Sequence, residues 1–397
     1  EAVDVNKTLT LLGPNAGIDP NTGARGPEAI IVTPSSDPLN PGFAGPMVVY
    51  LNAPGITFDG FIVDGDNPAL TSGVSFNGAD VDAEFGIYGD STPNPNATVR
   101  NNIVRNVGEF GVWLTSYSTN NSNGTSQILA NKVDNILGVY GQGLRIADNA
   151  WGNITGNVVT RVRNGIVVEN FSANALGQTA VISGNNVSSM RIGVRFNLHY
   201  TYGPAGFVVQ GNQAQPYLQS PAPGTGLPTS YQGIRVESIQ QNVPATVIDN
   251  VVSGNRATMT GGGYTRLEGL NVTNASATSP NIVFERNRVT NALRGLYHET
   301  TAQVRADSNV LDNNTEGVVL EPGAGLKLSG NMVSNSSLGI VVNSGTQLTA
   351  TGNSISNSLA AGVLVSGDGS GSTLLSGAPA NANTFVNNGA GTGMNIS

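Results

Sequence analysis

The sequence predicts an all-β protein, a single-stranded right-handed parallel β-helix (solenoid) of about eleven or more coils with three short strands each. Two observations predict this fold. Asn287, Asn309, Asn331 and Asn353 each follow the previous one by 22 residues, and period-2 apolar pieces separated by Asn or Gly fill the residues between them. A repeat of about 20 to 50 residues indicates a solenoid, and period-2 alternation indicates strands rather than helices.

The repeated unit reads apolar-x-apolar-x-x-Asn-x-Val-x-Asn-x-x-x-Gly-apolar-x-apolar. One copy contains Leu326, Leu328, Asn331, Val333, Asn335, Gly339, Ile340 and Val342. The first Asn recurs upstream as Asn102, Asn131, Asn157, Asn185, Asn212 and Asn250. Because Asn and Gly both adopt a left-handed backbone at low cost, we expect them at the bends, with the Asn amides stacked from coil to coil.

We expect one β-helix domain over residues 1–397, with irregular coils over 1–96 and regular repeats over 97–397. Regular coils have eight residues between the Asn and the Gly, whereas Asn212 and Gly233 are 21 apart and Asn250 and Gly269 are 19 apart. The sequence therefore predicts long inserted loops at 198–232 and 251–268.

Composition excludes several classes of protein. The net charge of −8, with 18 Lys and Arg along the whole chain, offers no basic stripe for nucleic acid. No apolar run approaches the roughly 20 residues of a membrane span. The absence of Cys excludes disulfides and thiolate metal sites.

The Asn-x-Val-x-Asn-x-x-x-Gly-Ile-x-Val unit resembles the parallel β-helix repeat of the pectate-lyase-like superfamily. The opening stretch from Lys7 through Leu-Gly-Pro-Asn-Ala to Gly17 is similar to the first coil of secreted bacterial β-helix proteins in this group. The resemblance covers roughly residues 97–397 and implies a secreted or cell-surface location. The group includes polysaccharide lyases, glycoside hydrolases and surface proteins, so the resemblance is specific for fold and weak for function.

The catalytic motifs of that superfamily are absent. Neither the hydrolase motifs Asn-Thr-Asp and Gly-His-Gly nor the lyase motif Trp-Ile-Asp-His occurs in the chain. The nearest fragments to the Arg-Ile-Lys motif, which begin at Arg145 and Arg191, lack the lysine.

The repeat register identifies side chains that point outward from one sheet. The strand after each Gly places Arg145, Arg195 and Arg235 in one outward slot, and Glu169 and Glu237 in the slot two residues later. The candidate catalytic residues are therefore Glu169, Arg195, Arg235 and Glu237. Two rungs of strand spacing separate the two carboxylates by about 9.6 Å, near the upper end of the range for inverting glycosidases.

Aromatic residues in the two insertions would stand beside this strip, where they could stack on the apolar faces of sugars. The candidate ligand-binding residues are Arg145, Tyr231 and Tyr264. A structural interpretation competes with both site hypotheses, because Arg and Glu on neighbouring rungs also form cross-strand ion pairs that stabilise an exposed sheet face.

Two further features bear on ligands and partners. Asp64, Asp66, Asp80 and Asp82 stand in turns and could bind Ca²⁺, although solvated acidic loops are the simpler interpretation, and no other cofactor is expected. Outward Val319, Val341 and Leu364 form an apolar row that suggests coverage by another segment or a partner. His298 falls in a slot that points inward.

Two functions remain open. The sequence favours a non-catalytic extracellular scaffold, an adhesive or assembly-forming surface protein with a polysaccharide or cell-surface glycan as a potential partner and with homo-oligomeric or end-to-end assembly. The alternative is a polysaccharide-active enzyme, a lyase or glycosidase, with its groove on the Arg195, Arg235 and Glu237 face. Nucleic acid is not an expected partner.

Overall fold

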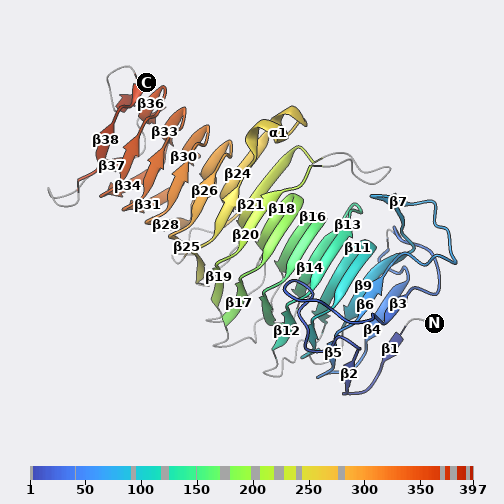
Figure 1. The fold of residues 1–397 in the computed structure, drawn as a ribbon. Helices are drawn as coiled ribbons and strands as arrows, with labels where there is room; N and C mark the ends of the chain where they lie inside the picture. Colours follow the sequence, from blue (N-terminus) through green and yellow to red (C-terminus); the bar gives the residue numbers. More distant parts are fainter. Residues whose placement is uncertain are drawn as a thin grey trace. The chain divides into compact units, whose positions relative to one another are not determined.

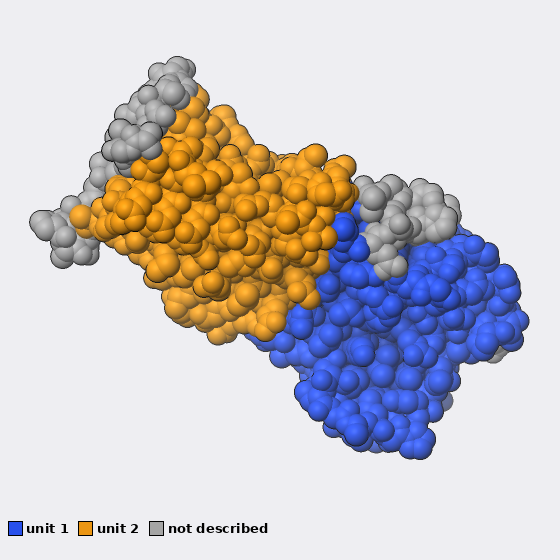
Figure 2. All heavy atoms as spheres, turned by 45° about the horizontal axis from the view of Figure 1, so that its top comes forward, with its two compact units in different colours: residues 1–195, 217–228 blue, residues 196–216, 229–397 orange. Residues whose placement is uncertain are grey.

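The computed structural model describes residues 3–40, 42–90, 95–117, 125–148, 150–169, 179–197, 206–218, 228–237, 244–275, 282–366, 372–375, 382–389 and 394–396. The chain divides into two compact units, which Figure 2 colours separately. Unit 1 comprises residues 1–195 and 217–228, and unit 2 comprises residues 196–216 and 229–397. Almost all the regular secondary structure of each unit consists of parallel strands (Figure 1), as expected for a parallel β-helix.

Unit 1 contains three ladders of parallel strands. The first joins β2 (Thr10–Leu12), β5 (Thr57–Asp59), β10 (Thr98–Arg100), β12 (Ser126–Leu129), β15 (Gly152–Thr155) and β17 (Thr179–Ser183). The second joins β3 (Ile30–Val32), β6 (Ile62–Asp64), the first half of β11 (Ile103–Ser116), β13 (Lys132–Ile136) and the first half of β16 (Val158–Glu169).

The third ladder of unit 1 carries the outward slots that the sequence singled out. It joins β1 (Val3–Val5), β4 (Met47–Leu51), β9 (Ala83–Gly89), the second half of β11, β14 (Gln142–Asp148) and the second half of β16. Strand β18 (Asn186–Asn197) follows β17 in the chain, and β7 (Ser75–Phe76) and β8 (Ala79–Asp80) form a small antiparallel hairpin.

Unit 2 repeats the same three ladders. The first joins β19 (Gly206–Gln210), β22 (Ala245–Ile248), β25 (Ile282–Glu285), β28 (Gln303–Asp307), β31 (Gly325–Ser329), β34 (Gln347–Thr351) and β37 (Ser372–Leu375). The second joins β20 (Gln213–Pro216), β23 (Val251–Ser253), β26 (Arg288–Thr290), β29 (Val310–Asp312), β32 (Met332–Ser334), β35 (Ser354–Ser356) and β38 (Thr384–Val386).

The third ladder of unit 2 joins β21 (Ser230–Glu237), β24 (Arg266–Thr273), β27 (Arg294–His298), β30 (Glu316–Leu320), β33 (Leu338–Val342), β36 (Ala361–Val365) and β39 (Met394–Ile396). Helix α1 (Arg256–Gly261) lies in the segment 251–268 that was expected to be an inserted loop. The other expected insertion, 198–232, contains β19 and β20 and begins β21, and its residues 198–205 and 219–227 lie outside the described residues.

The repeated Asn side chains form a buried hydrogen-bonded column, as the repeat predicts. The side-chain oxygen of Asn331 accepts from both the backbone N–H of Asn309, at 2.8 Å, and its side-chain amide, at 2.9 Å. The same pair of bonds joins Asn287 to Asn309 and Asn131 to Asn157. Each amide therefore satisfies backbone groups at a bend that solvent does not reach.

The left-handed bends lie only partly where the repeat predicts them. From Asn102 to Asn353, the residue before the column Asn has a positive φ, such as Ser308 at 55° and Gly330 at 63°. The second Asn of the unit can adopt it too, as Asn335 does at 53°, whereas the repeat glycines do not. A Cβ on Gly317 would lie 2.2 Å from Val333 Cγ1, so this glycine is required by close packing rather than by its backbone angle.

Candidate functional site

The predicted charged strip of unit 1 exists as an ion-paired group. Arg145 on β14 forms an ion pair with Glu169 on β16, and Arg195 Nη1 lies 3.8 Å from the other oxygen of the same carboxylate. All three side chains are mostly buried, with 13%, 12% and 26% exposed for Arg145, Glu169 and Arg195. Two guanidinium groups therefore hold one carboxylate.

Aromatic rings flank this group on the same ladder. Trp113 on β11 is paired in register with Tyr88 on β9 and with Arg145 on β14. The Arg145 guanidinium lies 4.2 Å from the centre of the Trp113 ring and 5.3 Å from that of Phe110. Such contacts are cation–π interactions, and burial among these rings lowers the pKa of Arg145 against the opposing effect of Glu169.

Arg235 and Glu237 of unit 2 also contact each other. They lie two residues apart on β21, and Arg235 Nη2 donates to Glu237 Oε1 at 2.8 Å while its Nη1 donates to the Gln232 side chain at 3.0 Å. Glu169 belongs to unit 1 and Glu237 to unit 2.

Tyr231 and Tyr264 are buried and present no exposed ring face to a ligand. Their exposed fractions are 0% and 2%, and they pack with Met259 of α1 and with Leu267 in one apolar cluster. Burial raises the pKa of the Tyr231 hydroxyl well above its usual value. Both rings serve here as core, because Met259 of α1 and Leu267 pack with them and almost no ring surface is left for a sugar.

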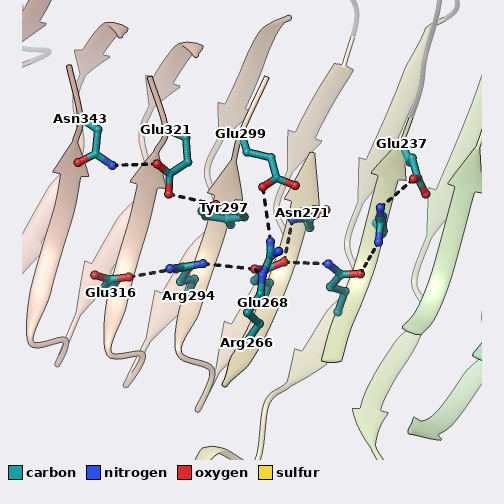
Figure 3. Close-up of polar contacts among 12 residues, drawn as sticks. Glu237, Arg266, Glu268, Asn271, Arg294, Tyr297, Glu299, Glu316, Glu321 and Asn343 are labelled. Atoms are coloured by element: carbon teal, nitrogen blue, oxygen red, sulfur yellow. Dashed lines mark hydrogen bonds and ion pairs between the residues drawn. The ribbon is translucent and has the colours of Figure 1, made fainter. Parts of the chain in front are cut away.

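Glu268 is the centre of the unit 2 network, and it lies outside the slots that the sequence singled out (Figure 3). Its side chain has 0% exposure. One oxygen accepts from Arg266 Nε at 2.8 Å and Arg294 Nη1 at 3.4 Å. The other accepts from the side-chain amides of Gln232 at 3.0 Å and Asn271 at 2.8 Å. A buried carboxylate is thus matched by four donors.

The network extends along the next strands of the ladder. Arg266 Nη2 lies 3.5 Å from Glu299 Oε2, and Arg294 Nε donates to Glu316 Oε2 at 3.2 Å. The Tyr297 ring lies between the two guanidinium groups, 5.3 Å from that of Arg266 and 4.4 Å from that of Arg294. Its hydroxyl donates to Glu321 at 3.0 Å, and Glu321 accepts in turn from the Asn343 amide at 3.3 Å (Figure 3).

The charged residues of the Glu268 network that were not predicted share one position in the sequence repeat. Glu268, Arg294 and Glu316 each stand directly before a repeat glycine and are paired in register on β24, β27 and β30. The predicted strip was drawn only from the slots after the glycine. The slot before the glycine carries these alternating charges and would have identified the network.

Three of the four acidic residues proposed for Ca²⁺ accept hydrogen bonds within unit 1. Asp64 accepts from Arg105 Nε at 2.6 Å and from the Asn106 amide at 2.8 Å, and Asp80 accepts from the Ser72 hydroxyl at 2.9 Å. Asp82 accepts from the Asn67 backbone N–H at 3.0 Å. Burial, together with Asp64, Asp82 and Asp80, raises the pKa of Asp66. In the described ranges no three His, Cys, Asp or Glu side chains are grouped to hold a metal ion, so Ca²⁺ is not supported.

Two of the three residues in the apolar row of unit 2 are buried by the chain itself. Val319 and Val341 are 3% and 7% exposed and pack with Tyr297 and Leu338, whereas Leu364 is half-buried. His298 points inward as the register predicts and has no exposed surface. Its Nε2 lies 2.9 Å from the Ala302 carbonyl oxygen and 3.2 Å from that of Gly325.

Comparison with known proteins gives one family. The sequence profile of the family described as "Periplasmic copper-binding protein (NosD)" matches residues 225–396, within the regular repeats. No curated protein matches the chain, and no solved structure does. The periplasmic location in the family's description agrees with the expected secreted or cell-surface location, which we adopt for this protein. None of the helices in the described ranges is long and apolar enough to cross a membrane.

Proposed function

We propose that the protein is a non-catalytic extracellular scaffold, a right-handed parallel β-helix of about eleven coils related to the pectate-lyase-like superfamily. The observation that carries this proposal is the pairing of the charged side chains. Glu169 lies between two arginines, Glu237 is bonded to Arg235, and Glu268 is fully buried under Arg266 and Arg294. A general acid or a nucleophile has to reach its substrate, whereas these carboxylates stabilise the sheet face on which they lie.

A scaffold of this kind presents a regular, repeated surface to a cell-surface glycan or to further copies of itself. The test combines a glycan array, the particle mass in solution, and assays for unsaturated and reducing sugars released from acidic polysaccharides. We expect glycan binding or oligomers without sugar release. Release that disappears in Glu169→Gln or Glu237→Gln would establish the enzyme alternative and overturn the scaffold.

Copper binding is the property named by the matched family, and the donor set of this chain does not fit it. Copper prefers thiolate, thioether and imidazole ligands, and the chain has no Cys, two His and five Met. Within the matched range, His298 is buried with its Nε2 against two carbonyl oxygens, and Met259 is buried under the Tyr231 cluster. Met332 is 49% exposed, on a different strand from either.

We therefore infer that the match reflects the repeat and not a copper centre. Titration calorimetry with Cu²⁺, and with Cu⁺ under reducing conditions, is the test. We expect the wild-type protein and a His298→Leu, Met332→Leu double variant to bind neither ion with a defined stoichiometry. One equivalent of tightly bound copper in the wild type, lost in the double variant, would contradict the inference.

A further inference from the structure

The exposed aromatic side chains of the described residues all lie in unit 1. Phe43 is 40% exposed, Tyr140 is 52% exposed and Tyr117 is 61% exposed. The Phe43 and Tyr140 rings contact each other, with 5.3 Å between their centres, and Val139, next to Tyr140 in the chain, is 44% exposed. Exposed apolar side chains that touch one another indicate a binding surface, whereas single ones do not.

These rings form the rim of one aromatic cluster on the third ladder. The Trp113 ring on β11 lies 6.5 Å from that of Phe43 and 5.2 Å from that of Tyr88 between ring centres. A hydrogen bond joins Tyr88 to Tyr117, and Phe43 also contacts Phe110 at 5.5 Å. From Phe110 to Tyr117 the chain follows β11 for about 23 Å. An extended ligand of several units can span such a surface, whereas a single small molecule cannot.

Phe43 has a backbone conformation that bulky residues rarely adopt. Its φ is 52°, in the left-handed region, where a glycine would fit without strain. The chain therefore carries an exposed ring at a position that disfavours it. Strained backbone of this kind occurs preferentially where a side chain contacts a ligand.

The charges around the cluster disfavour an acidic ligand. The groups that act on its side chains are the carboxyl groups of Asp4, Glu84, Asp90, Glu109, Asp148 and Glu169 and the guanidinium groups of Arg145, Arg163 and Arg195. The pKa values of Glu84 and Glu109 are raised to about 7 by burial. Even without these two charges, four carboxylates stand against three guanidinium groups, so an acidic chain would add charge of the sign already in excess.

The carboxylates in contact with the aromatic rings are already bonded. Asp90 accepts from the hydroxyls of Tyr50 at 2.6 Å and Tyr88 at 3.2 Å, and Glu169 is ion-paired with Arg145. The exposed rings therefore offer apolar surface and hydroxyl groups, and the contacting charges beside them are matched.

We propose that this aromatic cluster binds a neutral oligosaccharide, a chain of uncharged sugar units. The apolar faces of sugar rings stack on aromatic side chains, and their hydroxyl groups stay in water or bond to the tyrosine hydroxyls. Phe43 and Tyr140 contact one part of the chain, and Tyr117 contacts another. The proposal rests on the scaffold function, for which it names the class of glycan and the surface that binds it.

Titration calorimetry of the full chain in about 0.15 M salt, which screens long-range attraction, is the test. The probes are the neutral chains cellohexaose, maltohexaose and mannohexaose, the acidic hexagalacturonate and the basic hexaglucosamine. We expect at least one neutral chain to bind, and neither charged chain to bind more tightly than it. Tighter binding of a charged chain, or no binding of any neutral chain, would overturn the proposal.

Three variants locate the site. Phe43→Gly removes the ring and suits the backbone angle, so this variant should fold. Phe43→Gly, Tyr140→Ala and Tyr117→Ala should each weaken binding of the neutral chain by about fivefold to tenfold. Leu12→Ala is the matched control, because Leu12 is 61% exposed on β2 of the first ladder, away from the cluster. Unchanged affinity in Phe43→Gly and Tyr140→Ala, or an equal loss in Leu12→Ala, refutes the site.

The outcomes separate this site from the scaffold function. Neutral chains that are bound and then cleaved would overturn the scaffold, while the site would stand. A wild type that forms oligomers, releases no sugar and binds no neutral chain would overturn the site and leave the scaffold. Oligomers that dissociate in Phe43→Gly would show that the cluster contacts a second copy of the chain, which would also overturn the glycan site.

Discussion

The Glu268 carboxylate lies 2.8 Å from the Arg266 guanidinium with none of its own side chain exposed. Arg294 reaches the same oxygen at 3.4 Å from the neighbouring strand, so one buried charge joins β24 to β27. A buried ion is stable only while its partners remain, and removal of one partner leaves the others uncompensated.

Replacement of Glu268 should therefore cost much more than replacement of a surface carboxylate. Glu268→Gln keeps the shape of the side chain and removes its charge, and we expect the free energy of unfolding to fall by about 3 kcal/mol. Urea denaturation followed by circular dichroism measures it. Glu285→Gln is the control, because its carboxylate is 31% exposed beside Arg286 and should change stability by less than about 1 kcal/mol. Equal losses in the two variants would show that the network contributes no more than a surface pair.

Glu84 and Glu109 should make the stability of unit 1 depend on pH. Both are buried, with 0% and 3% exposed, and Glu84 accepts from the Gly45 N–H while Glu109 accepts from the Tyr140 N–H at 2.6 Å. Burial raises the pKa of each from 4.5 to about 7, and nearby Asp37 adds to the effect on Glu84 as Glu84 does on Glu109. The folded state thus favours the protonated form, so their contribution is full below pH 4.5 and is lost as pH rises through 7.

Thermal melts of the wild type and of a Glu84→Gln, Glu109→Gln double variant at pH 5 and pH 8 test this linkage. The amides of the double variant do not titrate. The stability of the double variant relative to that of the wild type should therefore be higher at pH 8 than at pH 5. A constant difference between the two proteins at both pH values would mean that the glutamates do not carry the effect.

The fold was predictable from the sequence because its cause is local and repeated. Asn309 and Asn331 reveal their role through a regular spacing of 22 residues, and Gly317 recurs because Val333 leaves no room for a Cβ. The site was less predictable. Arg145 and Glu169 were paired correctly by register, whereas burial of Tyr231 depends on α1, which interrupts the repeat and has no counterpart in the other described coils. Repetition therefore reveals the ladder, and irregular segments determine which of its side chains solvent can reach.

His298 should give unit 2 an opposite response to acid. Its side chain is fully buried, burial lowers its pKa below the usual 6.5, and its Nδ1 has no partner within the described chain. Nε2 faces the Ala302 and Gly325 carbonyl oxygens, and Glu299 is the nearby charged group. The neutral form is favoured in the folded state, so the contribution of His298 is full above pH 6.5 and is lost as pH falls through its lower folded pKa.

His298→Leu separates this effect from that of the glutamates. The paired positions on β24 and β30 are Val272 and Leu320, so Leu fits the slot. At pH 7.5 the variant should lose about 1 to 2 kcal/mol, since two carbonyls lose their donor. At pH 5 the loss should shrink or reverse, because the wild type must then bury a charge or break its packing. Urea denaturation of both proteins at the two pH values measures the difference in stability. An equal loss at pH 5 and pH 7.5 would refute the linkage.

The buried Asn column should be the most sensitive part of the repeat. Asn309 donates its side-chain amide to the Phe284 carbonyl at 3.0 Å and to Asn331 at 2.9 Å, and its oxygen accepts from both the backbone and the side chain of Asn287. Asn309→Ala would leave the buried Asn287 N–H without its acceptor and would remove the side-chain bonds to the Phe284 carbonyl and to Asn331. Each orphaned buried group costs about 1 to 3 kcal/mol, so we expect a total loss of about 3 to 5 kcal/mol.

Asn313→Gly provides the contrast on the exposed corner. Asn313 has a φ of 53°, which Gly adopts without strain, and its side chain makes an exposed bond of 2.6 Å to the Asn291 oxygen. We expect a change below about 1 kcal/mol, because water replaces the lost partner. Urea denaturation of both variants measures the difference. If Asn313→Gly proved as damaging as Asn309→Ala, the exposed side-chain bond of the corner would contribute as much as the buried amide column, and the prediction would be wrong.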